Sequence, residues 1–278
     1  MPLNFSLGGK TYEPVEATAD PEAIERYAAA SGDANPRYAA GPGQIASPLY
    51  PVVPGFPLMM MVGADPELEV GNPLMILHGE QEIVYHRPLL GGEALVLHPS
   101  LERVEDKGKG AVFVAGVRAG TPGGESVVDQ FWTIFVRGAG SGTDRPRQDS
   151  PPEPVRGEVV AEFTRHIDEG MPARYAEASG DHNPIHLDPG VAAAVGLPGV
   201  INHGLGTCAI VTGGLVDALF DGDATHLKRL AVRFTGMVAP GDDVGTIVWA
   251  PDEDGYPFET TRPDGTVVMS GTIQRRNP

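Results

Sequence analysis

YAEASGDHNPIH, the stretch from Tyr175 to His186, places a carboxylate and an imidazole five residues apart, with an Asn-Pro pair between them. Neighbours on one face of an α-helix lie three or four residues apart, and Pro184 cannot continue a helix because it lacks a backbone N–H. The second half of the stretch is therefore predicted to be a tight loop, in which Asn183 hydrogen-bonds its own backbone. Such a loop can direct Asp181 and His186 at one water molecule, as acid–base catalysis requires. Ordinary turn chemistry with a surface histidine stays open as the structural alternative.

A related stretch, YAAASGDANPRY, begins at Tyr27, which is 148 positions before Tyr175. PLLGGE at Pro88 and MVAPGD at Met237 form a second pair, separated by 149 positions. Two matches at nearly the same offset predict two copies of one structural unit. The first copy has a tyrosine where the second has His186, so no acid–base pair is expected there, and its Asp33 is expected to be structural.

The repeat predicts two domains, over 1–138 and 155–278, joined by a polar linker over 139–154. The linker is assigned because it is rich in Gly, Ser, Asp and Pro, a composition typical of connecting segments. Each copy is predicted to hold a helix followed by antiparallel strands, which is an α+β pattern. A curled sheet around a buried helix is the simplest way to pack these elements.

In the first copy, a helix is predicted over 21–30 with Asp20 as its N-cap. Prolines 48, 51, 54 and 57 indicate that no long helix starts before Pro57, so only a short helix over 58–62 is expected. Alternating apolar residues and turn signals predict the strands that follow, over 76–85, 95–104, 110–119 and 126–136.

In the second copy, helices are predicted over 171–179 and 191–195. The run 205–219 is apolar and rich in small residues, which favours a buried helix roughly 22 Å long. His203 and Gly204 come immediately before it, where helix N–H groups are free and carry partial positive charge. A strand is predicted around 230–234, and further strands over 244–249, 257–261 and 267–273.

Composition limits the classes of function. With 41% hydrophobic and 21% charged residues, the chain has the make-up of a soluble globular protein. A formal net charge of −17 argues against nucleic-acid binding, which needs a basic surface. Cys208 is the single cysteine, so no disulfide framework is expected. There is no apolar run of about 18 residues and no secretory signal over 1–12, so we expect no membrane span and a cytoplasmic location.

The stretch at 175–186, the segment 201–204 (INHG) and the Arg233-Phe234 strand resemble the MaoC-like R-specific enoyl-CoA hydratases and dehydratases. In the first copy, LHGEQ at 77–81 and DKG at 106–108 resemble the subgroup that includes the hydratase domain of peroxisomal multifunctional enzymes and long actinobacterial homologues. The resemblance covers nearly the whole chain. It implies a double hot-dog fold, two tandem antiparallel sheets each wrapped around a helix. It also implies that the first central helix is shortened to accommodate a bulky acyl chain.

The resemblance implies a lyase reaction of fatty acid metabolism, the reversible hydration of trans-2-enoyl-CoA to (3R)-3-hydroxyacyl-CoA. Asp181 and His186 would hold and activate the water, and Asn183 would orient this pair. Gly204 would donate its backbone N–H to the thioester oxygen, which gains negative charge in the transition state.

The same resemblance implies substrate-binding roles for His203, Thr212 and Arg233. No metal and no separate cofactor are expected, because coenzyme A or acyl carrier protein would arrive as part of the thioester. The partner would be the acyl-CoA molecule itself. Two hot dogs in one chain suffice for one pseudo-dimer, and by analogy with the family a homodimer of chains is expected.

Other interpretations of these residues remain open. Asp181, His182, His186 and His203 could bind a metal ion, although Pro184 interrupts the helix that the histidine spacing needs. Other residues have ordinary structural alternatives. His203 and Cys208 could simply fill the core, and His78 and Glu80 could form contacts between the halves. A solvated strand face, rather than a site for the phosphates of coenzyme A, could account for Lys228, Arg229, Arg233 and Arg262. At the level of function, the alternatives are a non-catalytic acyl-thioester-binding or assembly subunit and, less favoured, a thioesterase of the same fold.

Overall fold

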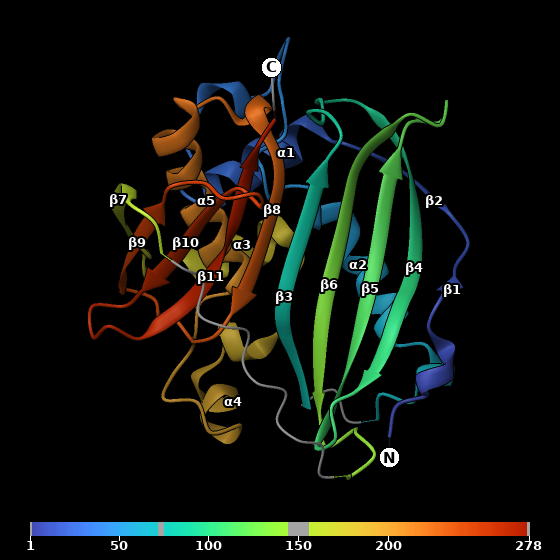
Figure 1. Ribbon diagram of the computed structural model, residues 1–278. Helices are drawn as coiled ribbons and strands as arrows, with labels where there is room; N and C mark the ends of the chain where they lie inside the picture. Colours follow the sequence, from blue (N-terminus) through green and yellow to red (C-terminus); the bar gives the residue numbers. More distant parts are fainter. Residues whose placement is uncertain (1, 72–74, 144–155, 277–278) are drawn as a thin grey trace.

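The computed structural model describes residues 2–71, 75–143 and 156–276. Figure 1 shows a curved sheet with the main helices on one side of it. The helices are α1 (Pro21–Ala30), α2 (Val52–Gly63), α3 (Met171–Ser179), α4 (Pro189–Ala194) and α5 (Gly204–Phe220). The strands are β1 (Lys10–Thr11), β2 (Val15–Thr18), β3 (Ile76–Tyr85), β4 (Ala94–Asp106), β5 (Gly110–Gly120), β6 (Ser126–Arg137), β7 (Val159–His166), β8 (Leu227–Phe234), β9 (Asp243–Trp249), β10 (Tyr256–Thr261) and β11 (Val267–Arg275).

One continuous antiparallel sheet unites the two halves, in the order β1-β4-β5-β6-β3-β8-β11-β10-β9-β7, with β2 also on β4. The halves meet where β3 pairs with β8, with Ile83 opposite Leu230 and Gln81 opposite Val232. With the repeat offset of 149, Gln81 corresponds to Leu230 and Ile83 corresponds to Val232. Each residue thus pairs with the counterpart of the other, so a pseudo-twofold axis lies between β3 and β8. The predicted α+β double hot dog is therefore confirmed as two units that share one sheet.

The helices follow the same pseudo-symmetry. Tyr27 of α1 and Tyr175 of α3 are fully buried, and their hydroxyls hydrogen-bond to each other at 2.9 Å. The central helix of the second half, α5, is buried along most of its 17 residues, whereas its counterpart α2 has 12. The shortened first central helix is thus present. Within the described residues, no helix is long and apolar enough to cross a membrane.

The predicted bounds of α2 were wrong, since the helix begins at Val52 rather than after Pro57. Pro51 is the residue before the helix and Pro54 lies in its first turn, where backbone N–H groups have no partner within the helix. Only Pro57 therefore removes an internal hydrogen bond, and burial of the apolar helix against the sheet offsets that loss. The predicted strands of the first half and the helices over 21–30 and 171–179 were confirmed to within about two residues.

The first residues of the predicted linker pack with the first half: Ala139 is buried, and its carbonyl accepts a hydrogen bond from the Leu3 N–H at 3.0 Å. Residues 144–154 of the linker lie outside the described part, so the boundary between the halves remains a prediction. Edge strand β7 was not predicted, although Val159 to His166 pairs along most of its length with β9.

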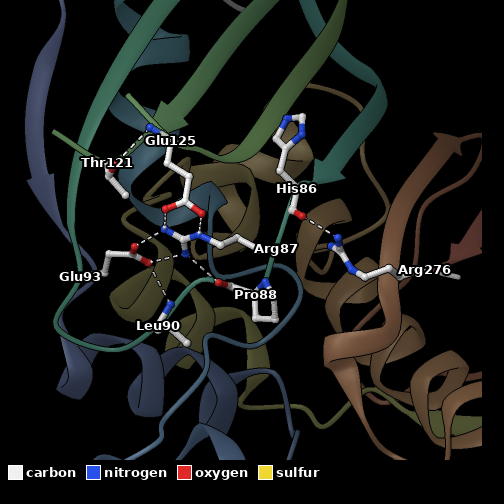
Figure 2. Close-up of polar contacts among 8 residues, drawn as sticks. All are labelled: His86, Arg87, Pro88, Leu90, Glu93, Thr121, Glu125 and Arg276. Atoms are coloured by element: carbon white, nitrogen blue, oxygen red, sulfur yellow. Dashed lines mark hydrogen bonds and ion pairs between the residues drawn. The ribbon is translucent and has the colours of Figure 1, made fainter. Parts of the chain in front are cut away.

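Polar contacts also fix the end of β3, as Figure 2 shows. The Arg87 guanidinium donates to Glu93 in the β3–β4 turn and to Glu125 in the β5–β6 hairpin. Arg276, at the end of the second half, donates to the backbone carbonyls of His86 and Tyr85. The strand that joins the halves is therefore held from both sides.

Candidate functional site

The loop after α3 has the geometry that its sequence predicts. Gly180 ends the helix in the left-handed region (φ 80°), which favours glycine. The Asp181 carboxylate accepts the Asn183 N–H at 3.1 Å, and the Asn183 side chain accepts the Ile185 N–H at 3.3 Å. These two local bonds turn the chain so that His186 follows within a single 3-10 turn.

The hydrogen bond of His186 fixes which ring nitrogen is free. Its Nδ1 lies 2.8 Å from the Ile201 carbonyl oxygen, which can only accept, so Nδ1 carries the proton in the neutral ring. Nε2 is then left with a lone pair. Burial lowers the pKa of His186, which favours this neutral form at physiological pH. The ring is therefore prepared to act as a base.

Asp181, His186 and His203 converge: one ligand atom from each side chain lies within 4.8 Å of the others. His203 donates from Nε2 to the Asp181 carbonyl at 2.9 Å, and its ring stacks on His186 with centroids 3.8 Å apart. It is 1% exposed. The spacing of these three side chains would also suit a metal ion. However, His203 stacks on His186 and uses its Nε2 to bind the Asp181 carbonyl, which favours a supporting role for His203 behind the loop.

A cavity of about 940 Å³ opens directly onto this loop. Asp181, Asn183, His186 and Gly204 lie in its wall. Its far side belongs to the first half, where the space between α2 and the sheet is lined by apolar side chains, among them Phe56, Met59, Phe113 and Ile134. The Asp181 loop, at the polar end of the cavity, and the apolar side chains beside α2 therefore come from different halves of the chain, although each half also contributes residues of the other kind, such as Asp65 and Phe234.

Gly204 is the first residue of α5, and its backbone is exposed at the polar end of the cavity. A Cβ added there would lie 3.5 Å from the Phe234 ring, so the ring packs directly against this turn. Helix N-termini present free N–H groups and partial positive charge. An oxygen that becomes negative can therefore be stabilised beside the Asp181–His186 pair.

None of the three predicted substrate-binding residues lines the cavity, and His203 lies behind the loop with its ring on His186. Thr212 lies two turns along α5, is 1% exposed, and sits 3.9 Å from the Cys208 sulfur. Arg233 faces the opposite side of the sheet, in a charged depression with Glu80 and Arg229. The orientation of Arg233 could have been predicted from the sequence. Successive side chains of a strand point to opposite faces, so Arg233 must face away from the cavity if its neighbour Phe234 faces it.

Three polar residues of the cavity wall were not predicted to lie there: Thr207, Asn202, which was named only within the segment 201–204, and His78, which was expected as a contact between the halves. The Asn202 amide donates to the Thr207 hydroxyl at 3.0 Å, and both side chains are nearly buried. Thr207 is three residues after Gly204, so helical spacing could have placed it on the same face. His78 comes from β3, and no local pattern links it to a loop a hundred residues away.

The corresponding loop of the first half lacks the pair, as its sequence indicates. Burial raises the pKa of Asp33, whose carboxylate accepts the Asn35 N–H at 3.1 Å. The Tyr38 side chain is buried, and its hydroxyl has no hydrogen-bond partner among the described residues. Asp33 thus has the turn-forming role of its counterpart without the adjacent imidazole.

Comparisons with known proteins agree with this architecture. Residues 150–267 match the family model "MaoC like domain", and residues 41–138 match "MFE-2 hydratase 2 N-terminal domain". The chain is 30% identical over 298 residues to the enoyl-CoA hydratase ChsH3 of Mycobacterium tuberculosis, covering 98% of each chain. It is 34% identical over 210 residues to the 3-hydroxyacyl-thioester dehydratase Y of the same organism, covering 71% of this chain and 70% of the relative.

Solved structures have the same fold. Full-length peroxisomal multifunctional enzyme type 2 from Drosophila melanogaster aligns with a TM-score of 0.78 and 26% identity, over 95% of this chain and 48% of that one. This chain thus spans about half of the Drosophila enzyme. A MaoC-like dehydratase from Phytophthora capsici aligns over 98% of both chains, with a TM-score of 0.82 and 24% identity. The chain belongs to the MaoC-like dehydratase family, in its double hot-dog form.

Proposed function

We propose that the protein hydrates trans-2-enoyl-CoA to (3R)-3-hydroxyacyl-CoA and catalyses the reverse dehydration. The observation that carries the proposal is the meeting of Asp181, His186 and the exposed N-terminus of α5 at one end of a large cavity. The Asp181 carboxylate and the His186 imidazole can together hold one water molecule, and the helix N-terminus can hold one carbonyl oxygen. The names of the relatives, enoyl-CoA hydratase and 3-hydroxyacyl-thioester dehydratase, support the same reaction.

In this mechanism, water lies between the Asp181 carboxylate and His186 Nε2. Its oxygen bonds to C3 as the pair removes one of its protons, and the electrons of the double bond move towards the thioester oxygen. The Gly204 N–H stabilises the negative charge on that oxygen. The protonated pair then delivers a proton to C2 as the carbonyl reforms. The sum is addition of H and OH across the double bond, with no metal or redox step.

The acyl chain would extend into the apolar end of the cavity, beside the shortened α2. A panel of trans-2-enoyl-CoA esters of increasing length and branching tests the reaction, through loss of the conjugated thioester absorbance and the configuration of the product alcohol. We expect turnover with a 3R product. Binding of the esters without any loss of absorbance would instead identify the non-catalytic acyl-thioester binder, and turnover to free acid would identify a thioesterase.

Met59 offers a test of where the acyl chain lies, because it lines the cavity from α2 and is 8% exposed. Substituting Met59→Trp should fill part of the apolar end. The specificity constant for long or branched enoyl-CoA should then fall about tenfold or more, while that for crotonyl-CoA changes little, because one lost methylene contact alone is worth at least about tenfold. Equal effects on short and long substrates would place the chain elsewhere.

A further inference from the structure

The proposed reaction gives no role to His78, which belongs to the LHGEQ motif of the first half. The β3–β6 register shifts between His78 and Glu80, so Gly79 forms a β-bulge. Bulges bend a strand and redirect its side chains, often beside active sites. Here the bulge turns His78 into the wall of the cavity that also contains Asp181.

One nitrogen of the His78 ring is committed. Its Nε2 lies 3.1 Å from the Glu80 carbonyl oxygen, so Nε2 carries the proton. Removal from bulk water lowers the pKa of His78 to about 4, although the Asp181 charge acts in the opposite direction. The ring is therefore neutral at physiological pH. Nδ1 therefore holds a lone pair. The Gln81 side chain also approaches the ring and raises this pKa by hydrogen bonding, and among the described residues no other side chain is bonded to Nδ1.

The ring is also held in place. It packs on Phe234, with ring centroids 5.0 Å apart and planes at 58°, and Phe234 in turn covers the turn at Gly204. His78 is thus one aromatic layer from the N-terminus of α5, where the thioester oxygen would bind. When a bound substrate displaces water from the cavity, a fixed hydrogen-bond acceptor at this position needs a donor from that substrate.

A trans-2-enoyl thioester has no donor on its acyl part. The hydroxyl of the hydrated product would lie at Asp181 and His186, where the water enters. The donor nearest the reacting atoms is the amide N–H of the thiol arm, two carbons from the sulfur. We propose that His78, contributed by the non-catalytic half, accepts this amide N–H through Nδ1 and so positions the thioester. The proposal rests on the hydratase function proposed above.

Two substitutions separate substrate binding from support of the bulge. His78→Asn keeps an acceptor oxygen near the position of Nδ1 but cannot reach the Glu80 carbonyl. His78→Gln keeps a donor near the position of Nε2 but loses that acceptor. We expect the KM for crotonyl-CoA to rise about three- to tenfold in His78→Gln, the range for one hydrogen bond, and to stay near the wild-type value in His78→Asn. The reverse order would mean that His78 only supports the bulge and would overturn the proposal. Thermal unfolding checks that both variants fold.

A second measurement identifies the group that His78 binds. The crotonyl thioester of N-acetylcysteamine has the amide N–H, and the crotonyl thioester of butanethiol lacks it. His78→Gln should lose about three- to tenfold in kcat/KM on the first and nothing on the second. Equal losses on both would exclude the amide. Wild-type turnover of crotonyl-CoA, measured in the same series, tests the hydratase function independently, so the two hypotheses can fail separately.

Discussion

At the scale of single residues, the proposed mechanism depends on two side chains of one loop, Asp181 and His186. Asp181→Asn keeps the size of the side chain and removes its charge. We expect turnover to fall by roughly two to four orders of magnitude, the range for a general acid–base group, and His186→Ala should behave similarly. Enoyl-CoA hydration kinetics measure the loss, and circular dichroism checks the fold. Near-full activity in either variant would remove that residue from the mechanism.

The buried histidines also predict how stability depends on pH. Burial lowers the pKa of His203 to about 4 and lowers that of His186, so between pH 6.5 and 4 the unfolded chain binds more protons than the folded one. Stability from these rings is complete above about pH 6.5 and is lost as pH falls towards 4. Urea midpoints measured across this window should fall, and His203→Gln should flatten the slope. Carboxylates with lowered pKa, such as Asp65, begin to lose their contribution below about pH 5, at the acid end of this window, so the comparison with His203→Gln isolates the share of the histidine.

At the scale of elements, the proposed mechanism assigns stabilisation of the negative charge to the N-terminus of α5. Gly204→Pro would delete its N–H while keeping the helix, because proline is well tolerated at the first helical position. Gly204→Ala is the matched control, since its Cβ would make an ordinary contact with Phe234. We expect kcat to drop about 100- to 1000-fold in the proline variant and little in the alanine variant. Similar activity in both would mean that this N–H does not contact the thioester oxygen.

Element-level prediction from sequence succeeded where signals are local and failed where a proline's position in its helix or a distant strand decides. The strand predicted over 76–85 matches β3, because its alternation and flanking turns are local signals. The start of α2 was wrong because the prediction treated every proline as a helix breaker, whereas Pro51 and Pro54 occupy positions at the helix start that need no N–H. The loop at Asp181 could be predicted since its turn chemistry lies in adjacent residues. His78 could not, because a β-bulge far along the chain brings it there.

At the scale of the whole molecule, one hydrogen bond lies on the pseudo-symmetry between the halves. Tyr27 and Tyr175 donate to or accept from each other at 2.9 Å, in a fully buried setting. Tyr27→Phe or Tyr175→Phe leaves one hydroxyl buried without a partner, which should cost about 1–3 kcal/mol of unfolding free energy. The double variant should cost less than the sum of the two, as coupled neighbours do.

Urea unfolding of the four proteins measures this coupling. Tyr256→Phe serves as a control, because the Tyr256 hydroxyl makes no hydrogen bond with the described residues. Strict additivity of the two tyrosine substitutions would show that the contact contributes nothing to the union of the halves.

The unequal lengths of α2 and α5 have an evolutionary consequence. When two identical chains form a symmetric pair, every substitution appears twice. A change that shortened one helix to enlarge the space for a substrate tail would also shorten the helix whose N–H is proposed to contact the carbonyl. Fusing the two units into one polypeptide releases them from this constraint, so each can diverge alone. The cost is a single reaction centre where a symmetric pair would offer two.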